Sequence, residues 1–216
     1  MEIFYQDNDI VVCKKEYGIS SQASGGENML DIIRDTLGLE AYAVHRLDVT
    51  TSGVMVYALN RQSASALCAQ VANRTLEKTY LAIVHGEAPT GERLCDYLFH
   101  DKRVNKSFIV GKERAGVKEA ILSYERLGTA TLFNMSVSLL KIKLETGRTH
   151  QIRAQLSHRQ MSLLGDKKYG ARDACRQIAL YSYSIKFVHP KTKKEMEFRC
   201  EPSDPVYLEL LRALSD

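Results

Sequence analysis

The sequence contains no tryptophan and only 4 prolines, and no apolar run approaches the roughly 20 residues that a membrane-spanning helix needs. Its start, MEIFYQDNDI, lacks the basic region and the apolar core of a secretory signal. These absences predict a soluble, cytoplasmic protein that does not bind membranes. The composition, with 44% hydrophobic and 26% charged residues, allows a sizeable core and excludes disordered and low-complexity chains.

Metal-binding patterns are also missing. The 5 cysteines are widely separated and form no C-x-x-C pair, and the 6 histidines are scattered, His150 and His158 being the closest two. We therefore expect no metal site, and we expect the cysteines to act as small apolar fillers.

The spacing of apolar residues predicts more strands than helices, and the strands come in runs rather than in strict alternation with helices. This order favours a single α+β domain over residues 1–216, with a largely antiparallel mixed sheet flanked by helices. A change of phase near Leu139 and Leu140 indicates a β-bulge. Strands are expected over residues 10–13, 54–59, 76–84, 120–127, 133–144, 181–187 and 196–200; helices over 29–37, 64–71 and 205–214; and a loop or hairpin over 100–118.

Positive charge is concentrated in one part of the chain. Residues 141–200 hold 14 basic and 5 acidic side chains, a net charge of +9, whereas the remainder holds 16 basic and 21 acidic, a net charge of −5. Such an excess fits the phosphate backbone of a nucleic acid. A solvated surface that binds no nucleic acid is the alternative, because surfaces rich in lysine and arginine are common.

The first polar cluster, HRLDVTTSG, spans residues 45–53 and lies directly before the apolar run that begins at Val54. Asp48 fits two roles: a catalytic carboxylate, or a turn residue that accepts hydrogen bonds from nearby backbone N–H groups. For an isolated aspartate in a loop the turn is the commoner role.

The second cluster, LETGRTHQIR, spans residues 144–153, where a strand ends, Gly147 turns the chain and a helix opens with Ile152 and Leu156 facing inward. Arg148 lies at that junction. It fits either a weak tether to an exposed carboxylate or a partner that keeps a buried aspartate ionised.

Two further segments each allow a purely structural interpretation and a functional one. Tyr80, in the strand KTYLAIVHG, is either a core residue or a platform for base stacking. The basic turn GDKKYG, residues 165–170, is either an ordinary loop or a phosphate contact.

Together these segments resemble the RluA family of RNA pseudouridine synthases. HRLDVTTSG is similar to the family's H-R-L-D-x-x-T-S-G signature, KTYLAIVHG to K-x-Y-x-A-x-V-x-G, LETGRTHQIR to L-x-T-G-R-x-H-Q-I-R, and LLGDKKYG to L-G-D-x-x-Y-G, all in the family's order. Weaker likeness extends from about Asp9 to Pro202, nearly the whole chain. Departures occur at residues 15–18, KEYG in place of K-P-x-G, at Ser162 and at residues 180–182, and they affect the expected RNA target rather than the reaction.

The resemblance implies an isomerase that flips a uridine out of the RNA and rearranges its glycosidic bond without any cofactor. It implies that Asp48 is the essential carboxylate, that Tyr80 packs on the uracil, that Arg148 pairs with Asp48, and that Arg46 fills the gap left by the flipped base. Further RNA contacts are expected from motif residues and basic residues: His45, Thr51, Lys78, His150, Arg153, Lys167 and Lys168.

The resemblance also defines the expected partners. The RNA would be a ribosomal or transfer RNA stem-loop, bound by a monomer, and the accessory S4-type domain of many relatives is expected to be absent. Two other functions are weighed against this one. An RNA-binding assembly factor would not need the three catalytic residues, and an aspartate-dependent nucleoside or glycoside hydrolase normally shows a second acid in its motif.

Overall fold

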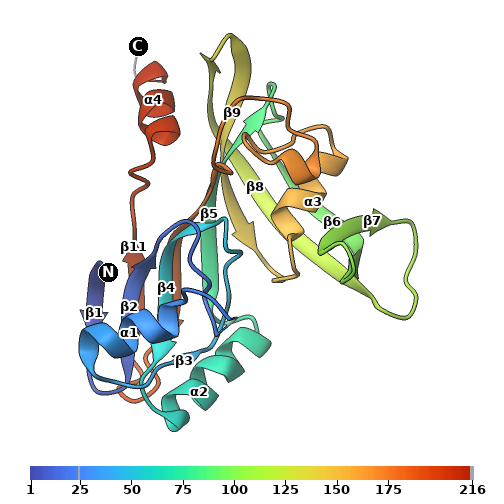
Figure 1. The fold of residues 1–216 in the computed structure, drawn as a ribbon. Helices are drawn as coiled ribbons and strands as arrows, with labels where there is room; N and C mark the ends of the chain where they lie inside the picture. Colours follow the sequence, from blue (N-terminus) through green and yellow to red (C-terminus); the bar gives the residue numbers. More distant parts are fainter. Residues whose placement is uncertain (24, 215–216) are drawn as a thin grey trace. The chain divides into compact units, whose positions relative to one another are not determined.

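A computed structural model describes residues 1–23 and 25–214. Its chain divides into two compact units, which are described separately (Figure 1). Unit 1 comprises residues 1–79 and 181–201, and unit 2 comprises residues 80–180 and those from 202 onward. Strand β5 (Glu77–His85) crosses the boundary and contributes its first three residues to unit 1. That residues 1–216 act as one domain remains a prediction.

Unit 1 contains strands in the hydrogen-bonded order β1-β2-β4-β10, with β3 paired to β4 and β11 paired to β10. Most of these pairs are antiparallel, whereas β10 runs parallel to β4. The elements of unit 1 are β1 (Ile3–Gln6), β2 (Ile10–Lys15), α1 (Met29–Leu37), β3 (Tyr42–Ala43), β4 (Ser52–Ala58), α2 (Arg61–Ala72), β10 (Leu180–Val188) and β11 (Glu195–Arg199).

The core strand β4 begins three residues after the HRLD segment, and every one of its residues is buried. Gly53, near its start, has a φ of +120°, and a Cβ atom there would lie 2.2 Å from the carbonyl oxygen of Ser182. Only glycine therefore permits the close parallel approach of β4 and β10 at this point. This packing fixes the residues that follow Asp48 in the sequence.

Unit 2 contains the antiparallel strand order β9-β8-β6-β7. Helix α3 and the 3-10 turn η1 pack on this sheet through Leu98, Ala120, Ala154 and Tyr169. Its elements are the end of β5, β6 (Gly91–Asp101), β7 (Lys106–Val110), β8 (Val117–Leu132), β9 (Met135–Leu144), α3 (Gln151–His158), η1 (Lys167–Tyr169) and α4 (Pro205–Ala213).

The predicted α+β class and largely antiparallel mixed sheet are confirmed, and residues 100–118 form the predicted hairpin. The bulge also lies where the phase changes, with the extra residue on β8 between Arg126 and Gly128, opposite Leu140 and Leu139. Strands β1, β3 and β6 were not predicted. Cys13 and Cys200 are buried as expected, but the filler role is wrong for Cys68 and Cys95, which are exposed. No helix within the described residues has the length and apolar character to cross a membrane.

Candidate active site

Asp48 lies in unit 1, in the turn between β3 and β4. Its carbonyl oxygen accepts a 3.0 Å hydrogen bond from the backbone N–H of Thr51, which closes the turn, and its side chain is half-buried. Thr51 itself is buried, with 2% of its surface exposed. The turn thus presents a partly accessible carboxylate on a backbone that is fixed at its C-terminal side.

The side chain of Lys15, at the end of β2, forms a hydrogen bond to the backbone of this turn. It is completely buried, and its Nζ donates to the carbonyl oxygens of Glu16 at 2.9 Å, Ile19 at 2.8 Å and Val49 at 3.3 Å. Burial lowers the pKa of Lys15 to about 8, against the attraction of the Asp48 and Glu16 carboxylates, which raises it. Three carbonyl acceptors match the three N–H donors of an ammonium group.

Two more side chains fix the backbone on the N-terminal side of Asp48. The hydroxyl group of Ser21 donates to the carbonyl oxygen of Leu47 at 3.1 Å and accepts from its N–H at 3.3 Å. Nε2 of buried His45 accepts from the N–H of Val56 at 3.2 Å. Burial, together with the charge of Lys78, lowers the pKa of His45 to about 3, so this imidazole is neutral at pH 7. Arg46 between these anchors is exposed.

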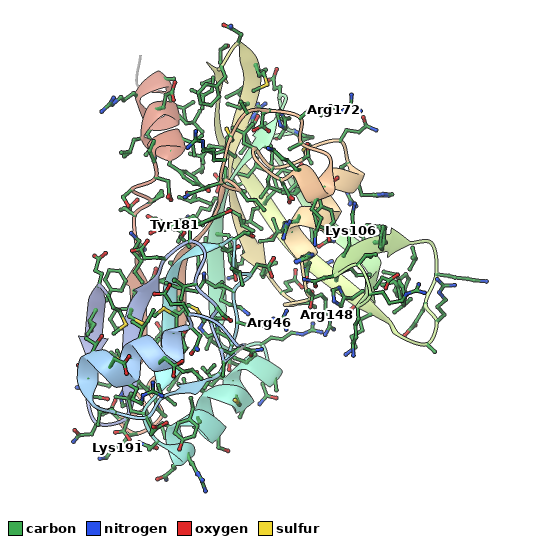
Figure 2. All side chains as sticks on the ribbon, viewed as in Figure 1. Arg46, Lys106, Arg148, Arg172, Tyr181 and Lys191 are labelled. Atoms are coloured by element: carbon green, nitrogen blue, oxygen red, sulfur yellow. The ribbon has the colours of Figure 1, made fainter. Side chains whose placement is uncertain are left out.

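In unit 2, Arg148 lies on the loop between β9 and α3, and Tyr80 lies on β5 with 5% of its surface exposed. Nε of Arg148 donates to the carbonyl oxygen of Glu119 at 2.9 Å. The side-chain oxygen of Gln151 accepts from the N–H of Arg148 at 3.0 Å and from the hydroxyl of Thr146 at 2.8 Å. Figure 2 labels Arg148 on this loop.

The same loop continues to His150, whose backbone is left-handed with a φ of 53°. Nδ1 of His150 lies 3.1 Å from the hydroxyl oxygen of Tyr169, which also accepts from the N–H of Ser107 at 2.7 Å. The hydroxyl of Ser107 donates to the carbonyl oxygen of Thr149 at 2.6 Å. The loop of Arg148, the β6–β7 hairpin and the basic turn are therefore joined through Tyr169.

The basic residues expected to bind RNA differ in their surroundings. Arg153 is buried and forms a bidentate ion pair with Asp166, at 2.7 and 2.8 Å, an arrangement typical of a structural residue. Lys167 and Lys168 are exposed, and Nζ of Lys168 donates to the carbonyl oxygen of Asn105 at 3.1 Å. Burial lowers the pKa of Lys78. RNA contacts by these residues and by His45, Thr51 and His150 stay predictions.

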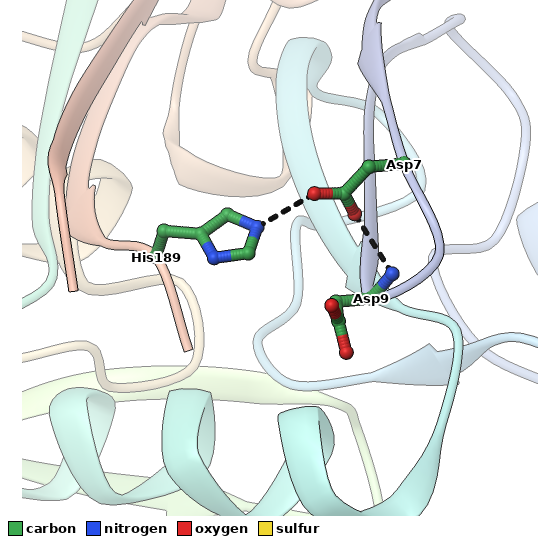
Figure 3. A group of neighbouring side chains, drawn as sticks. All are labelled: Asp7, Asp9 and His189. Atoms are coloured by element: carbon green, nitrogen blue, oxygen red, sulfur yellow. Dashed lines mark hydrogen bonds and ion pairs between the residues drawn. The ribbon is translucent and has the colours of Figure 1, made fainter. Parts of the chain in front are cut away.

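One group of side chains has the types that bind metals. Ligand atoms of Asp7, Asp9 and His189 lie within 4.8 Å of one another (Figure 3). However, Asp7 accepts from the N–H groups of Asp9 and Ile10 and lies 2.8 Å from Nε2 of His189. Asp9 accepts from Asn60 and Ser63. These bonds tie the β1–β2 turn to the β10–β11 hairpin, so the group is explained as a structural clamp.

The structure groups the predicted residues by unit. It brings His45, Arg46, Asp48 and Thr51 together in unit 1 and Arg148, His150 and Arg153 together in unit 2. The pairing of Asp48 with Arg148, and the place of Tyr80 beside them, stay predictions. Lys15 and Gln151 were missed as supports, because a single lysine at a strand end and a single glutamine at a helix start have many common roles. The K of the KEYG segment was the available signal for Lys15.

A sequence model described as RNA pseudouridylate synthase matches residues 9–158. The chain is 32% identical to the "Ribosomal large subunit pseudouridine synthase C" of Buchnera aphidicola subsp. Schizaphis graminum, over 98% of this chain and 70% of that protein. The chain belongs to the RNA pseudouridylate synthase family. Its RluA-type motifs agree with this membership, and members of the family are isomerases that convert uridine in RNA to pseudouridine.

Other relatives support the same assignment. The "tRNA pseudouridine synthase C" of Haemophilus influenzae is 31% identical over 91% of this chain and 90% of that protein. The fold is similar to that of "Human RNA Pseudouridylate Synthase Domain Containing 1", with a TM-score of 0.83, 21% identity, and coverage of 99% of this chain and 94% of that one.

Proposed function

We propose that this RNA pseudouridine synthase modifies specific uridines in ribosomal or transfer RNA, with Asp48 as its essential carboxylate and residues 1–216 acting as one catalytic domain. The observation that carries the proposal is the support of the Asp48 turn: a buried ammonium, Ser21 and His45 hold its backbone while the carboxylate stays partly accessible. Such preorganisation is what a group that touches substrate requires. The names of the relatives provide the two RNA classes.

The reaction breaks the bond between N1 of uracil and C1′ of ribose and forms a bond between C5 and C1′. An ionised Asp48 either attacks C1′ or removes the proton at C2′ to give a glycal. The detached uracil then turns and its C5 bonds to C1′, while the bond between C1′ and the carboxylate breaks in the first route and the proton returns to C2′ in the second. The C5 proton leaves and N1 gains a proton, which completes the isomerisation. No oxidant, reductant or energy source is consumed, and no cofactor is needed. Both routes require the carboxylate to be negatively charged.

The remaining roles follow from the family's motifs. Arg148 keeps Asp48 ionised, the ring of Tyr80 packs on the uracil, and Arg46 replaces the extruded base. Flipping exposes the glycosidic bond at a cost of a few kcal/mol, which is smallest in loops of the RNA. The exposure of Arg46 supports this role, because a side chain that enters an RNA helix must project from the protein surface.

The phosphate backbone is bound mainly in unit 2, where Lys167 and Lys168 are exposed. His45, Thr51, Lys78, His150 and Arg153 complete the proposed contacts or shape the surface beside them. We further propose that the protein acts in the cytoplasm as a monomer, without a membrane partner.

The test is to incubate the purified protein with mixed ribosomal and transfer RNA and to map pseudouridine at nucleotide resolution. Wild type should form pseudouridine at defined sites, and Asp48→Asn, which keeps the shape and loses the charge, should form none. Asp35→Asn, which removes an exposed carboxylate of α1, is the matched control and should behave as wild type.

Three outcomes would contradict the proposal. Release of free uracil would indicate hydrolysis. Pseudouridine formation by Asp48→Asn at the wild-type rate would remove Asp48 from the catalytic role. If Asp48→Asn corrected every cellular defect of a deletion strain while forming no pseudouridine, the protein's main task would be that of an RNA-binding assembly factor.

A further inference from the structure

The two faces of the β6–β7 hairpin differ in what covers them. On one face, Leu98 and Ile109 pack against the cluster that includes Ala154 of α3. Residues alternate between faces in a strand, so the neighbours of these residues lie on the opposite face. Three aromatic side chains occur there: Tyr97, Phe99 and Phe108.

These three side chains form an aromatic ladder, defined here as Tyr97, Phe99 and Phe108. Phe99 lies directly opposite Phe108 in the register of β6 and β7. Tyr97 is 36% and Phe108 41% exposed, so part of each ring is open to solvent. A ligand can therefore reach part of the rings of Tyr97 and Phe108, whereas Phe99 between them is half-buried.

Positive charge surrounds the ladder. The guanidinium carbon of Arg114 lies 5.8 Å from the ring centre of Phe99, and Nζ of Lys106 lies 5.6 Å from that of Phe108. Residues 97–118 contain 6 basic and 2 acidic side chains. Exposed rings with interleaved cations form the combination that binds unpaired nucleic acid, because bases stack on the rings and phosphates pair with the cations.

The ladder is also continuous with the loop of Arg148. Tyr97 pairs with Glu119 across the strands β6 and β8, and the carbonyl oxygen of Glu119 accepts the hydrogen bond from Nε of Arg148. At the other end, Nζ of Lys106 lies 5.0 Å from the ring centre of Tyr169, which is bonded to His150. Figure 2 labels Lys106 and Arg148, the two cations that mark these ends.

We propose that the aromatic ladder stacks unpaired bases of the RNA strand that flanks the uridine to be modified. This inference rests on the proposed function and adds to it the chemical nature of the contact: single-stranded RNA bound through its bases, with little sequence preference, rather than a duplex bound through its phosphates. Stacking on aromatic side chains tolerates any base because every base has a π-face.

The absence of tryptophan allows a direct test. Phe108→Trp introduces a single fluorophore into the ladder, and titration with a short oligouridine RNA should quench its fluorescence to a plateau. Phe133→Trp is the matched control, because Phe133 lies 53% exposed in the β8–β9 turn of the same unit. Its fluorescence should change little.

A second measurement uses affinity and turnover. Loss of one stacked base weakens binding about tenfold, so Phe108→Ala should raise KM for the RNA substrate about tenfold with kcat nearly unchanged. Phe108→Tyr should restore KM, since it restores a ring, and Phe133→Ala should match wild type. Unchanged KM in Phe108→Ala, with the RNA shown to bind by fluorescence anisotropy, would overturn the proposal.

Photocrosslinking uses the wild-type protein, so its result does not depend on whether a variant folds. RNA that carries 5-iodouridine beside the target should form adducts at Tyr97 or Phe108, read by mass spectrometry. Adducts confined to other residues would overturn the proposal and would indicate that the face of the aromatic ladder binds a partner other than the RNA. The failure of the proposed function is a separate result, because it would abolish pseudouridine formation by wild type, whereas crosslinking and quenching report stacking alone.

Discussion

The buried ammonium group of Lys15 donates to the carbonyl oxygen of Val49, the residue that directly follows Asp48, and the carboxylate of Asp48 raises the pKa of that ammonium. A completely buried charge is costly unless hydrogen bonds and a counter-charge compensate it. The segment of Asp48 contributes to both compensations, through the Val49 carbonyl oxygen and the Asp48 carboxylate, and the neighbouring residues Glu16 and Ile19 provide the rest. We therefore expect Lys15 to act as a positioning residue for the turn that carries Asp48.

Lys15→Met should lower kcat about 10- to 100-fold with KM changed little, because small misplacements of a reacting group cost about that much. The variant keeps the apolar stem and removes the donors to three carbonyl groups. Lys14→Met is the control, because Lys14 pairs with Glu16 and does not carry this network. Steady-state kinetics give both constants for the comparison. Equal kcat values for wild type and Lys15→Met would show that the turn keeps its position without Lys15.

The pH dependence of turnover should report the same lysine. The pKa of Lys15 is about 8, and a neutral amine has one N–H fewer than the three acceptors require. We expect kcat to fall as the pH rises through about 8. The residual activity of Lys15→Met should lack this step. A profile with the same step in both proteins would assign the titration to another group.

Stability should move in the opposite direction. The pKa of Lys15 is lower in the folded chain than its ordinary value of 10.5, so between about pH 8 and 10.5 the unfolded chain binds more protons. The contribution of Lys15 to the free energy of unfolding therefore rises with pH across this window. Urea unfolding of wild type and of Lys15→Met at several pH values isolates the contribution of Lys15 as the difference between the two. A difference that stays constant or falls would contradict the lowered pKa.

Much of the fold was predictable because each buried element has a simple apolar pattern. Strand β4 is apolar without interruption and lies within a covered sheet, and the stripe of α1 faces the core at Met29 and Ile33. Strand β6 was missed because Asp96 occupies the inward phase between Leu94 and Leu98. That carboxylate is neutralised by Arg159, the residue that follows α3, at 2.9 Å. This partner lies 63 residues away, and local patterning does not reveal it.

The candidate site was predictable only in its motifs. The sequence indicated Asp48 and Arg148, since each lies in a polar cluster at the end of an apolar element. It did not indicate the supports, because Lys15 and Gln151 act through contacts with backbone groups that any sequence presents. It also gave Arg153 the same expected role as Lys167, although a buried partner, Asp166, distinguishes it.

Gly53→Ala should destabilise the protein strongly. Its added Cβ would lie 2.2 Å from the carbonyl oxygen of Ser182, and the φ of +120° is unfavourable for alanine. The parallel pairing of β4 with β10 must then open at the residues that follow Asp48. Thermal unfolding should show a clear decrease in Tm. Gly26→Ala is the control, because a Cβ atom there would meet nothing within 4 Å.

Arg153→Met should cost about 3–5 kcal/mol in the free energy of unfolding, because it leaves the carboxylate of Asp166 buried without its partner. Urea unfolding provides the value. If Arg153 contacted phosphate instead, the substitution would leave stability nearly unchanged and would reduce the salt dependence of RNA binding. The two measurements on one variant therefore separate a structural role from an RNA-binding role.

Lys167→Ala with Lys168→Ala should show the reverse pattern. Both side chains are exposed, so unfolding should change by about 0.5 kcal/mol or less. Each lost phosphate contact should reduce the slope of log affinity against log salt by about 0.7–0.9, giving a total decrease between one and two if both lysines bind phosphate. Lys191→Ala with Lys193→Ala, two lysines of the β10–β11 hairpin in unit 1, is the charge-matched control. A slope reduced equally by both double variants would show that the decrease reflects net charge rather than contact at the basic turn.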